Sequence, residues 1–284
     1  EAAGVVAGTG GGAGNLTEGQ RVTFDSTIYC GACDFCRKGQ VNLCENRRVI
    51  GVSCDEYRRH GAFAEYVAVP RRVVYPIADS LSFEKAATVE PLSVAVHAVK
   101  RSGASRGDTV VVVGAGMIGL LAVQVLKARG CGPVFAVDPD QGRLELACRL
   151  GAQEGFDPAQ AEIPAEVLRR TGGRGADIVL EAVGLASTVQ TAAGCLRKGG
   201  ALALVGNLCP EVPLALQKVV ARELSLFGCC ASSGDYPECL EMLAEGVVRV
   251  DELISATAPL AQGPELFARL YNKEKGLLKV CLLP

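Results

Sequence analysis

A glycine pattern in the middle of the chain limits the possible folds more than any other feature. Residues 114–119 read Gly-Ala-Gly-Met-Ile-Gly, directly after the β-branched run 109–113 and at the start of an amphipathic stretch at 116–129. A strand, a glycine turn and a helix in this order typically begin a parallel βαβ unit. The pattern therefore predicts a parallel sheet that is covered by helices on both faces.

Further strand and helix signals follow the glycine pattern. The predicted strands are 134–137, 177–180, 201–205 and 223–228, and the predicted helices between them are 142–150, 187–195 and 216–222. This alternation is typical of an α/β protein with a doubly wound, Rossmann-type sheet. The tail changes character, and its predicted elements are helices at 236–245 and 262–271 and a strand at 277–282.

The part of the chain before the glycine pattern has a different rhythm. Residues 1–75 are predicted to be rich in β-structure, because short apolar runs at 4–6, 21–24 and 64–69 are separated by glycine turns. Residues 83–100 have helix spacing, and Pro91 should divide them into two helices. Two structural regions of different class are therefore expected.

Each glycine of the pattern has a stereochemical role if residues 114–119 bind a dinucleotide. Gly114 would permit the tight turn, Gly116 would let the backbone approach a pyrophosphate, and Gly119 would let the helix pack close to the strand. Asp138, 19 residues after Gly119, would accept hydrogen bonds from the ribose hydroxyls and repel a 2′-phosphate, which favours NAD over NADP. Arg143 could stack on adenine, although a solvated helix arginine fits the spacing equally well. A plain strand–turn–helix without a ligand is the alternative.

Four closely spaced cysteines form the second strong motif. Cys30, Cys33, Cys36 and Cys44 lie in a loop-like segment with glycine and asparagine. Four thiolates can converge on one tetrahedral Zn²⁺, and a site without an open coordination position is structural. An iron–sulfur cluster is the main rival, but the spacing matches no ferredoxin pattern. The nine other cysteines are scattered, which suits buried thiols in a reducing cytoplasm.

The composition excludes several classes of function. The net charge is −2, Trp is absent and aromatic residues make up 5% of the chain, so neither nucleic acid nor an anionic membrane is an expected partner. No apolar run approaches the roughly 20 residues of a membrane span. A small-molecule substrate is expected instead.

The cysteine cluster and the glycine pattern, in this order, resemble the zinc-containing medium-chain alcohol dehydrogenase superfamily, and specifically its sorbitol (polyol) and threonine dehydrogenase branch. Residues 61–67, 90–97, 177–184 and 204–206 are similar to further segments of that branch. The resemblance implies a GroES-like β-barrel catalytic domain into which a Rossmann NAD-binding domain is inserted. The expected boundaries are 1–91 for the catalytic domain, 92–231 for the NAD-binding domain and 232–284 for the return to the catalytic domain.

The resemblance also implies a second, catalytic zinc. Glu1 resembles the residue that follows the histidine of a Gly-His-Glu motif, so it would be a ligand of that zinc. Glu90 would be the remaining acidic group, either as a direct ligand or as the residue that holds the zinc-bound water. Taken alone, Glu90 before Pro91 would be a helix N-terminal carboxylate. The resemblance implies that a Cys and a His ligand precede Glu1, and hence that the chain is truncated at its N-terminus.

Other cofactor contacts follow from the resemblance. Ile118, Val205 and Gly206 would line the cofactor cleft, and Lys279 would reach the pyrophosphate, although an exposed lysine on an edge strand fits Lys279 as well. The family commonly forms dimers or tetramers, so a homo-oligomer is expected.

The implied reaction is hydride transfer from a secondary alcohol to NAD, with the zinc acting as a Lewis acid on the substrate hydroxyl. Polyol dehydrogenases carry an arginine after the strand that matches 225–228, but residues 228–234 contain none. Another polyol, a sugar-phosphate alcohol and L-threonine therefore stay open as substrates. A non-catalytic NAD-binding protein without the reactive zinc is the alternative from a different class, and a quinone reductase conflicts with the cysteine cluster.

Overall fold

The computed structural model describes residues 1–52 and 55–284. The chain divides into two compact units, and each is described by itself. Unit 1 consists of Glu1–Ser93 and Ala231–Pro284, and unit 2 of Val94–Cys230. Unit 2 is thus an insertion in the sequence of unit 1, and its limits lie close to the boundaries expected at 91/92 and 231/232.

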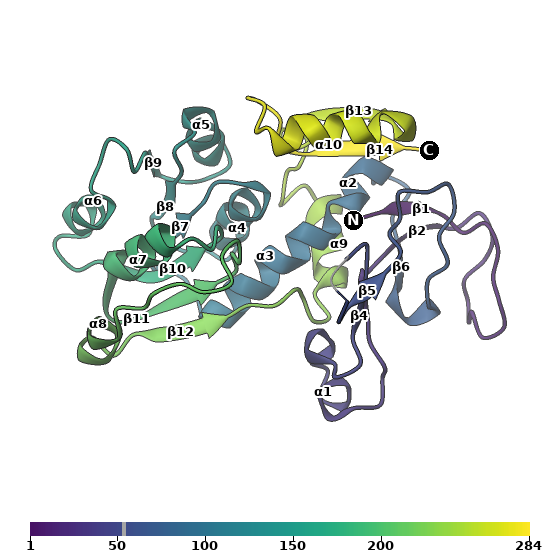
Figure 1. The fold of residues 1–284 in the computed structure, drawn as a ribbon, viewed down its shortest axis with the longest axis horizontal. Helices are drawn as coiled ribbons and strands as arrows, with labels where there is room; N and C mark the ends of the chain where they lie inside the picture. The colour runs from purple at the N-terminus through teal and green to yellow at the C-terminus, as the bar shows by residue number, and fades with distance from the viewer. Residues whose placement is uncertain (53–54) are drawn as a thin grey trace. The chain divides into compact units, whose positions relative to one another are not determined.

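Unit 2 is built on a six-stranded sheet in which every pairing is parallel. In spatial order its strands are β12 (Ser225–Gly228), β11 (Leu196–Leu204), β10 (Ala176–Glu181), β7 (Val110–Val113), β8 (Val134–Val137) and β9 (Glu154–Phe156) (Figure 1). The strand order reverses between β7 and β10, and ligands of such sheets bind at the carboxyl ends of the strands at this point. The predicted doubly wound parallel sheet is confirmed.

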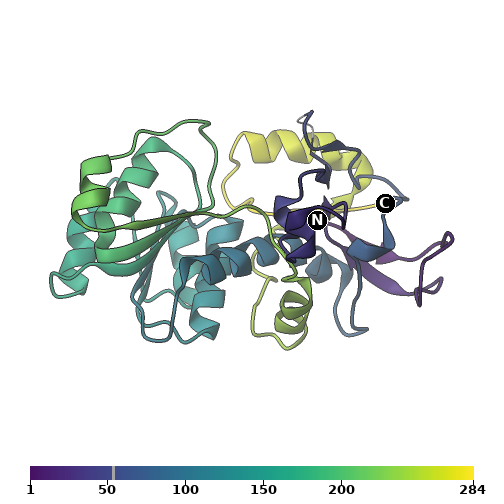
Figure 2. The same cartoon turned by 90° about the horizontal axis from the view of Figure 1, so that it is seen from below.

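Helices lie on both faces of this sheet, as Figures 1 and 2 show. They are α4 (Met117–Ala128), α5 (Gln141–Arg149), α6 (Ile163–Arg170), α7 (Ala186–Cys195) and α8 (Leu216–Ala221). Helix α6 and strand β9 were not among the sequence predictions. Strand β9 has only three residues, too few to show a period-2 pattern. Helix α6 buries Ile163 and Val167, four residues apart, and has a proline in its first turn, so its signal was present in the sequence.

The central strands of unit 2 are buried on both faces, so their sequences do not alternate between apolar and polar residues. All four valines of β7 are buried, as are all residues of β8 and β10. A parallel strand with helices on both faces has no solvent-facing side, so a continuous β-branched run is favoured. Of the helices in the described residues, none is both long and apolar enough to cross a membrane.

Unit 1 contains three small sheets rather than one large one. The first contains β1 (Ala3–Val5), β2 (Arg21–Phe24) and β6 (Val74–Pro76), the second β3 (Thr27–Ile28), β4 (Arg48–Ile50) and β5 (Arg58–Arg59), and the third β13 (Ala256–Pro259) and β14 (Val280–Leu283). The run 64–69 was wrongly predicted to be a strand. Its backbone has no partner strand among the described residues, and side-chain propensity alone does not form a strand without one.

The helices of unit 1 are short except for α3, which continues into unit 2. They are α1 (Asp34–Arg37), α2 (Phe83–Ala87), α3 (Val89–Ser102), α9 (Tyr236–Ala244) and α10 (Gly263–Tyr271), with 3₁₀ turns η1 (Val41–Leu43), η2 (Arg71–Val73) and η3 (Leu260–Gln262). The predicted division of 83–100 into two helices is confirmed, but the break falls at Thr88 and not at Pro91. Pro91 lies in the first turn of α3, where a missing N–H breaks no helical hydrogen bond.

Candidate functional site

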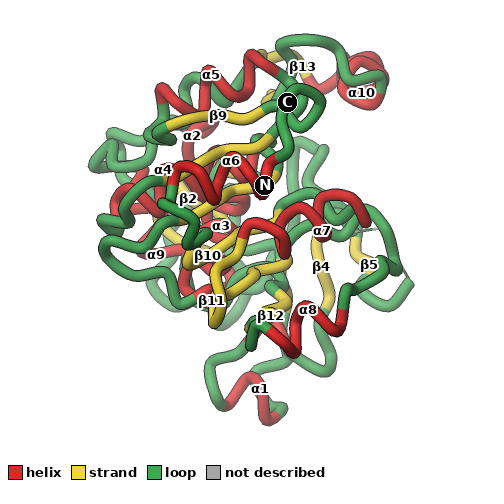
Figure 3. The backbone as a smooth tube through the Cα atoms, turned by 90° about the vertical axis from the view of Figure 1, so that its left-hand side faces the viewer, coloured by secondary structure: helices red, strands yellow, loops and turns green. Residues whose placement is uncertain are grey.

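The four predicted metal-ligating cysteines lie together in a lobe between β3 and β4. Their Sγ atoms all lie within 4.8 Å of one another, and those of Cys30 and Cys36 are 3.9 Å apart. A tetrahedral zinc with Zn–S bonds of about 2.3 Å requires sulfur atoms about 3.8 Å apart. Figure 3 shows that loop makes up most of the chain around α1, and backbone hydrogen bonds of short turns, such as Gly39 N–H to the Cys36 carbonyl over 3.1 Å, hold this lobe. The donor set and its spacing therefore fit a zinc ion.

Backbone amides donate hydrogen bonds to two of the cysteine sulfur atoms. The N–H groups of Ala32 and Cys33 each donate to Cys30 Sγ over 3.3 Å, and the N–H of Cys30 donates to Cys44 Sγ over 3.2 Å. The amides of Ala32 and Cys33 lower the pKa of Cys30 to about 6, whereas desolvation, followed by the neighbouring thiols, raises the pKa of Cys36 to about 12. Four thiolates cannot coexist without a counter-charge, which a divalent metal would supply.

The glycine loop has the geometry that its sequence predicts. A Cβ on Gly119 would lie 1.8 Å from the Gly114 carbonyl oxygen, and a Cβ on Gly114 would lie 2.6 Å from Val183 Cγ2. Gly114 also has φ of +96°, a conformation that side chains rarely adopt. A Cβ on Gly116 would meet nothing within 4 Å. The first and third glycines are therefore required by packing, and the second faces open space from which a ligand could approach.

Asp138 connects the end of β8 to this loop. Its Oδ2 accepts a hydrogen bond from the N–H of Ala115 over 2.8 Å, and its Oδ1 accepts one from the N–H of Asp140 over 2.9 Å. The residue is 6% exposed. Each carboxylate oxygen keeps a second acceptor position, so both can also receive a ribose hydroxyl. The N–H of Arg143 donates to Asp140 Oδ1, which starts α5; stacking of the Arg143 side chain on adenine stays a prediction.

The ends of β10 and β11 lie beside the glycine loop. The N–H groups of Val205 and Gly206 donate to the Glu181 carbonyl over 2.9 and 3.0 Å, and a Cβ on Gly206 would lie 2.2 Å from the backbone of Val183. Val183 in turn contacts Gly114, as described above. The structure thus brings the predicted residues Val205 and Gly206 to the strand-order reversal, and Ile118 lies in the first turn of the helix that follows the loop.

Glu181 is a site residue that sequence reasoning missed. Its side chain is fully buried, and its carboxylate accepts hydrogen bonds from the N–H groups of Val183 and Gly184. These bonds fix the turn that contacts the glycine loop. An acidic residue at the end of the apolar run 178–180 was the available signal, since a buried charge needs a specific partner.

The two predicted acidic ligands, Glu1 and Glu90, both belong to unit 1. Burial raises the pKa of Glu90, and a hydrogen bond with the Ser26 side chain opposes this rise. A joint role of Glu1 and Glu90 as ligands of a catalytic zinc stays a prediction. The Lys279 ammonium forms an ion pair with Glu1, and its predicted contact with the pyrophosphate stays a prediction.

Two buried polar residues of unit 1, Asp25 and Tyr236, were also missed. Asp25 is 5% exposed and accepts a hydrogen bond from the N–H of Thr27 over 2.7 Å, and burial raises its pKa to about 6. The ring of Tyr236 stacks on Tyr75 with 5.0 Å between centroids. Its hydroxyl is buried and finds no hydrogen-bond partner in the described part of the chain. Burial, then the charges of Asp25 and Glu90, raise the pKa of Tyr236.

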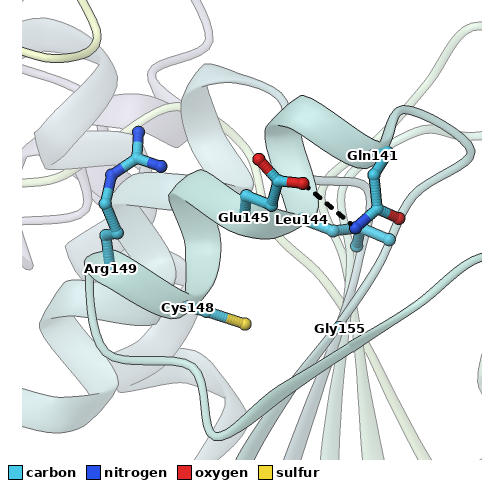
Figure 4. Close-up of a pocket in the computed structure, with 6 residues that line it drawn as sticks. All are labelled: Gln141, Leu144, Glu145, Cys148, Arg149 and Gly155. Atoms are coloured by element: carbon cyan, nitrogen blue, oxygen red, sulfur yellow. Dashed lines mark hydrogen bonds between the residues drawn. The ribbon is translucent and has the colours of Figure 1, made fainter.

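Unit 2 has a surface pocket of about 370 Å³ (Figure 4). It is formed by α5 and β9, and its lining residues are Gln141, Leu144, Glu145, Cys148, Arg149 and Gly155. The Cys148 sulfur points toward the backbone of β9 near Gly155, and burial raises the pKa of this thiol. A raised pKa makes the Cys148 thiol less ionised than an ordinary cysteine.

Comparison with known proteins gives matches along nearly the whole chain. The family model "Alcohol dehydrogenase GroES-like domain" matches residues 1–79, and the model "Zinc-binding dehydrogenase" matches residues 118–245. Sorbitol dehydrogenase of Bacillus subtilis is 32% identical over 285 residues, which cover 100% of this chain and 80% of that protein. D-xylulose reductase A of Aspergillus oryzae is 34% identical, with 94% of this chain and 75% of that protein covered. An alcohol dehydrogenase from Thermus sp. ATN1 has a similar structure, with a TM-score of 0.93 at 32% identity, covering 99% of this chain and 82% of that one.

Proposed function

This chain belongs to the zinc-binding medium-chain dehydrogenases, in their polyol dehydrogenase branch, and from this premise we propose that it oxidises a secondary alcohol of a polyol or sugar-type substrate with NAD as the hydride acceptor. The observation that carries the proposal is the buried Asp138 carboxylate bonded to the glycine loop at the strand-order reversal. A carboxylate there binds the two ribose hydroxyls of NAD and repels the 2′-phosphate of NADP. Two curated relatives named for sorbitol and D-xylulose support the substrate class.

The residues of unit 2 would bind and orient the cofactor. The loop 114–119 presents the N-terminus of α4 to the pyrophosphate, where free N–H groups and the helix dipole favour an anion. Ile118, Val205 and Gly206 would line the cleft and exclude water from it. A fixed cofactor and a dry cleft favour hydride transfer over side reactions.

The residues of unit 1 would hold the metals. Glu1 and Glu90 would hold the catalytic zinc, which when bound supplies Lewis acidity toward the substrate hydroxyl. The Glu90 carboxylate is buried and has the Ser26 side chain as a hydrogen-bond partner. Cys30, Cys33, Cys36 and Cys44 would hold a structural zinc that takes no part in the reaction.

The proposal extends to the cellular compartment and the oligomeric state of the enzyme. We infer that the chain acts in the cytoplasm, where thiols stay reduced, because its cysteines in the described part of the chain are all free. We also propose that it forms a homo-oligomer, either a dimer or a tetramer. Its substrate is a small alcohol.

The test is reduction of NAD⁺ by the zinc-loaded protein over a panel of polyols, sugar phosphates and L-threonine. We expect turnover with at least one polyol, and a clear preference for NAD⁺ over NADP⁺. In the variant Asp138→Ser this preference should fall by about tenfold or more, because the repulsion of the 2′-phosphate is lost. The variant Glu90→Gln should bind NADH like the wild type but turn over slowly.

The possible results separate the alternatives. Turnover only with a sugar phosphate or L-threonine would move the substrate assignment to that class. NADH binding without turnover of any secondary alcohol, in protein with its full zinc content, would refute the proposed activity and support a non-catalytic NAD-binding protein.

A further inference from the structure

The segment 231–235, Ala-Ser-Ser-Gly-Asp, lies where polyol dehydrogenases are expected to carry an arginine. It enters α9, and two of its residues, Ala231 and Gly234, have positive φ values of 49° and 76°. Ser232 and Asp235 are buried, with 3% and 2% of their surface exposed. Every contact of this segment that is described below lies within unit 1.

One serine of the segment binds the cysteine lobe. The Ser233 hydroxyl donates to the Gly39 carbonyl over 2.7 Å and accepts from the N–H of Val41 over 3.1 Å. Both partners lie in the loop between Cys36 and Cys44. The N–H of Ser233 donates to Asp235 Oδ2 over 3.0 Å, which fixes the serine backbone. The hydroxyl can make both lobe bonds only while residues 39–41 keep their positions.

The adjacent serine is connected to the backbone of Glu90. The Ser93 hydroxyl donates to the Glu90 carbonyl over 2.7 Å, and the Ser93 and Ser232 Oγ atoms are 2.9 Å apart. A hydroxyl has a single hydrogen, and that of Ser93 is used on Glu90, so Ser232 is the donor in the second bond. Ser93 is fully buried, and loss of such a bond leaves a desolvated polar group. The first turn of α3 is therefore sensitive to the position of Ser232.

We propose that Ser232 and Ser233 are positioning residues that couple the order of the cysteine lobe to the backbone of Glu90. The coupling rests on the proposed function, in which the lobe holds zinc and Glu90 belongs to the reactive site. A displacement of the lobe would move Ser233, which is hydrogen-bonded to it. Because Ser232 is the neighbouring residue in the chain, its hydrogen bond with Ser93 would then shift, and so would the bond between Ser93 and the Glu90 carbonyl. If the segment 231–235 only formed the start of α9, it would need no hydrogen bonds to the cysteine lobe or to Ser93.

The test is a double-mutant cycle read by amide hydrogen exchange in peptides that cover residues 88–96. Cys33→Ala weakens the lobe site, and its zinc content is measured alongside. Cys33→Ala and Ser233→Ala should each raise exchange in this region by about fivefold, because each weakens the connection to Ser232 by about the net free energy of one hydrogen bond. Exchange in the double variant should be no faster than in either single variant, because both substitutions break the same connection.

Ser255→Ala is the matched control for Ser233. Ser255 also accepts a backbone hydrogen bond, from Leu278 over 2.8 Å, but it does not contact the lobe. This variant should leave exchange at 88–96 unchanged, and Ser233→Thr, which keeps the hydroxyl, should restore the wild-type exchange. Additive effects of Cys33→Ala and Ser233→Ala would overturn the proposal, as would wild-type exchange in Ser233→Ala alone.

A kinetic comparison on α3 separates positioning from plain stability. Ser93 and Ser102 are both buried serines of α3 that donate to the carbonyl three residues earlier, but only Ser93 contacts Ser232. Ser93→Ala should lower kcat by about tenfold at unchanged KM for NAD⁺, and Ser102→Ala should change neither by more than about twofold. Coupled exchange without any turnover would refute the proposed function and leave the coupling standing; equal effects of the two substitutions would overturn the coupling to Glu90.

Discussion

At the scale of single residues, Asp177 shows how a buried charge is used for structure in unit 2. Its carboxylate accepts hydrogen bonds from Arg197 Nε over 2.6 Å and from the N–H of Thr109 over 2.9 Å, and it pairs with Arg174. Burial by itself would raise the pKa of Asp177, but these hydrogen bonds outweigh burial and lower the pKa below its ordinary value of 3.8. The carboxylate thus connects the starts of β7, β10 and β11.

We predict that Asp177→Asn lowers the free energy of unfolding at neutral pH by about 2 kcal/mol, because Arg174 and Arg197 lose a buried anionic partner. A lowered pKa in the folded state adds stability above the ordinary pKa, and this stability is lost as the pH falls through the folded value. The difference between variant and wild type should therefore shrink below about pH 4 in urea titrations.

The control for this prediction is Asp251→Asn. Asp251 is 68% exposed and pairs with Lys85 over 2.8 Å, and such surface pairs contribute about 0–1 kcal/mol. Its substitution should change stability little at any pH. A loss in Asp177→Asn that stayed constant from neutral pH to pH 3 would contradict the role assigned to its charge.

At the scale of elements, the β7–loop–α4 unit determines where a cofactor can bind. The helix starts close to the strand because Gly119 has no side chain, and the loop turns because Gly114 can adopt a positive φ. Gly116 is the N-cap of α4, with φ of −75°, which other residues adopt without strain. The three glycines are therefore unequal, although the sequence pattern treats them alike.

We predict that Gly119→Ala and Gly116→Ala separate folding from binding. Gly119→Ala should cost about 2 kcal/mol or more of unfolding free energy and remove NADH binding, because its Cβ would overlap the Gly114 carbonyl. Gly116→Ala should cost less than about 1 kcal/mol but still weaken NADH binding, because its Cβ would lie in the space left for the pyrophosphate. Urea unfolding and NADH fluorescence measure the two effects. Wild-type stability of Gly119→Ala would show that the loop can shift freely.

At the scale of the whole molecule, the exposed apolar residues around α8 bear on the oligomeric state. Leu208, Leu214, Leu216 and Val220 are 71%, 44%, 64% and 68% exposed. They lie in and before α8, which precedes β12 in the chain, and β12 is an edge strand that pairs only with β11 among the described strands. An edge strand with exposed apolar neighbours is a suitable surface for pairing with a second copy.

We predict that the protein sediments as a dimer or tetramer, and that the double substitution Leu216→Glu with Val220→Glu lowers its mass at micromolar concentrations. Charged side chains cannot be buried in an interface without a partner, so association should weaken. Tyr271→Glu, at a residue of unit 1 that is 88% exposed, is the control and should leave the mass unchanged. A wild-type monomer at these concentrations would contradict the prediction.

The elements that the sequence predicts well are those with a clear internal pattern. Strand β7 was predicted because it is an uninterrupted run of valines, and helix α4 because its helical spacing extends over 12 residues. Strand β9, with three residues, leaves too short a mark. The run 64–69 has the side chains of a strand but lacks a partner strand in the described part of the chain, so its composition is misleading.

The same division holds for the candidate site. The sequence by itself determined the cysteine lobe and the glycine loop, because their function depends on spacing within fifteen residues or fewer, and local geometry then restricts which residues can serve. The tertiary structure alone decided that Ser233 bonds to Gly39, 194 residues away, and that Tyr236 is buried against Tyr75. Those contacts depend on which segments the packed core brings together, and the sequence around one residue does not indicate which distant residue will contact it.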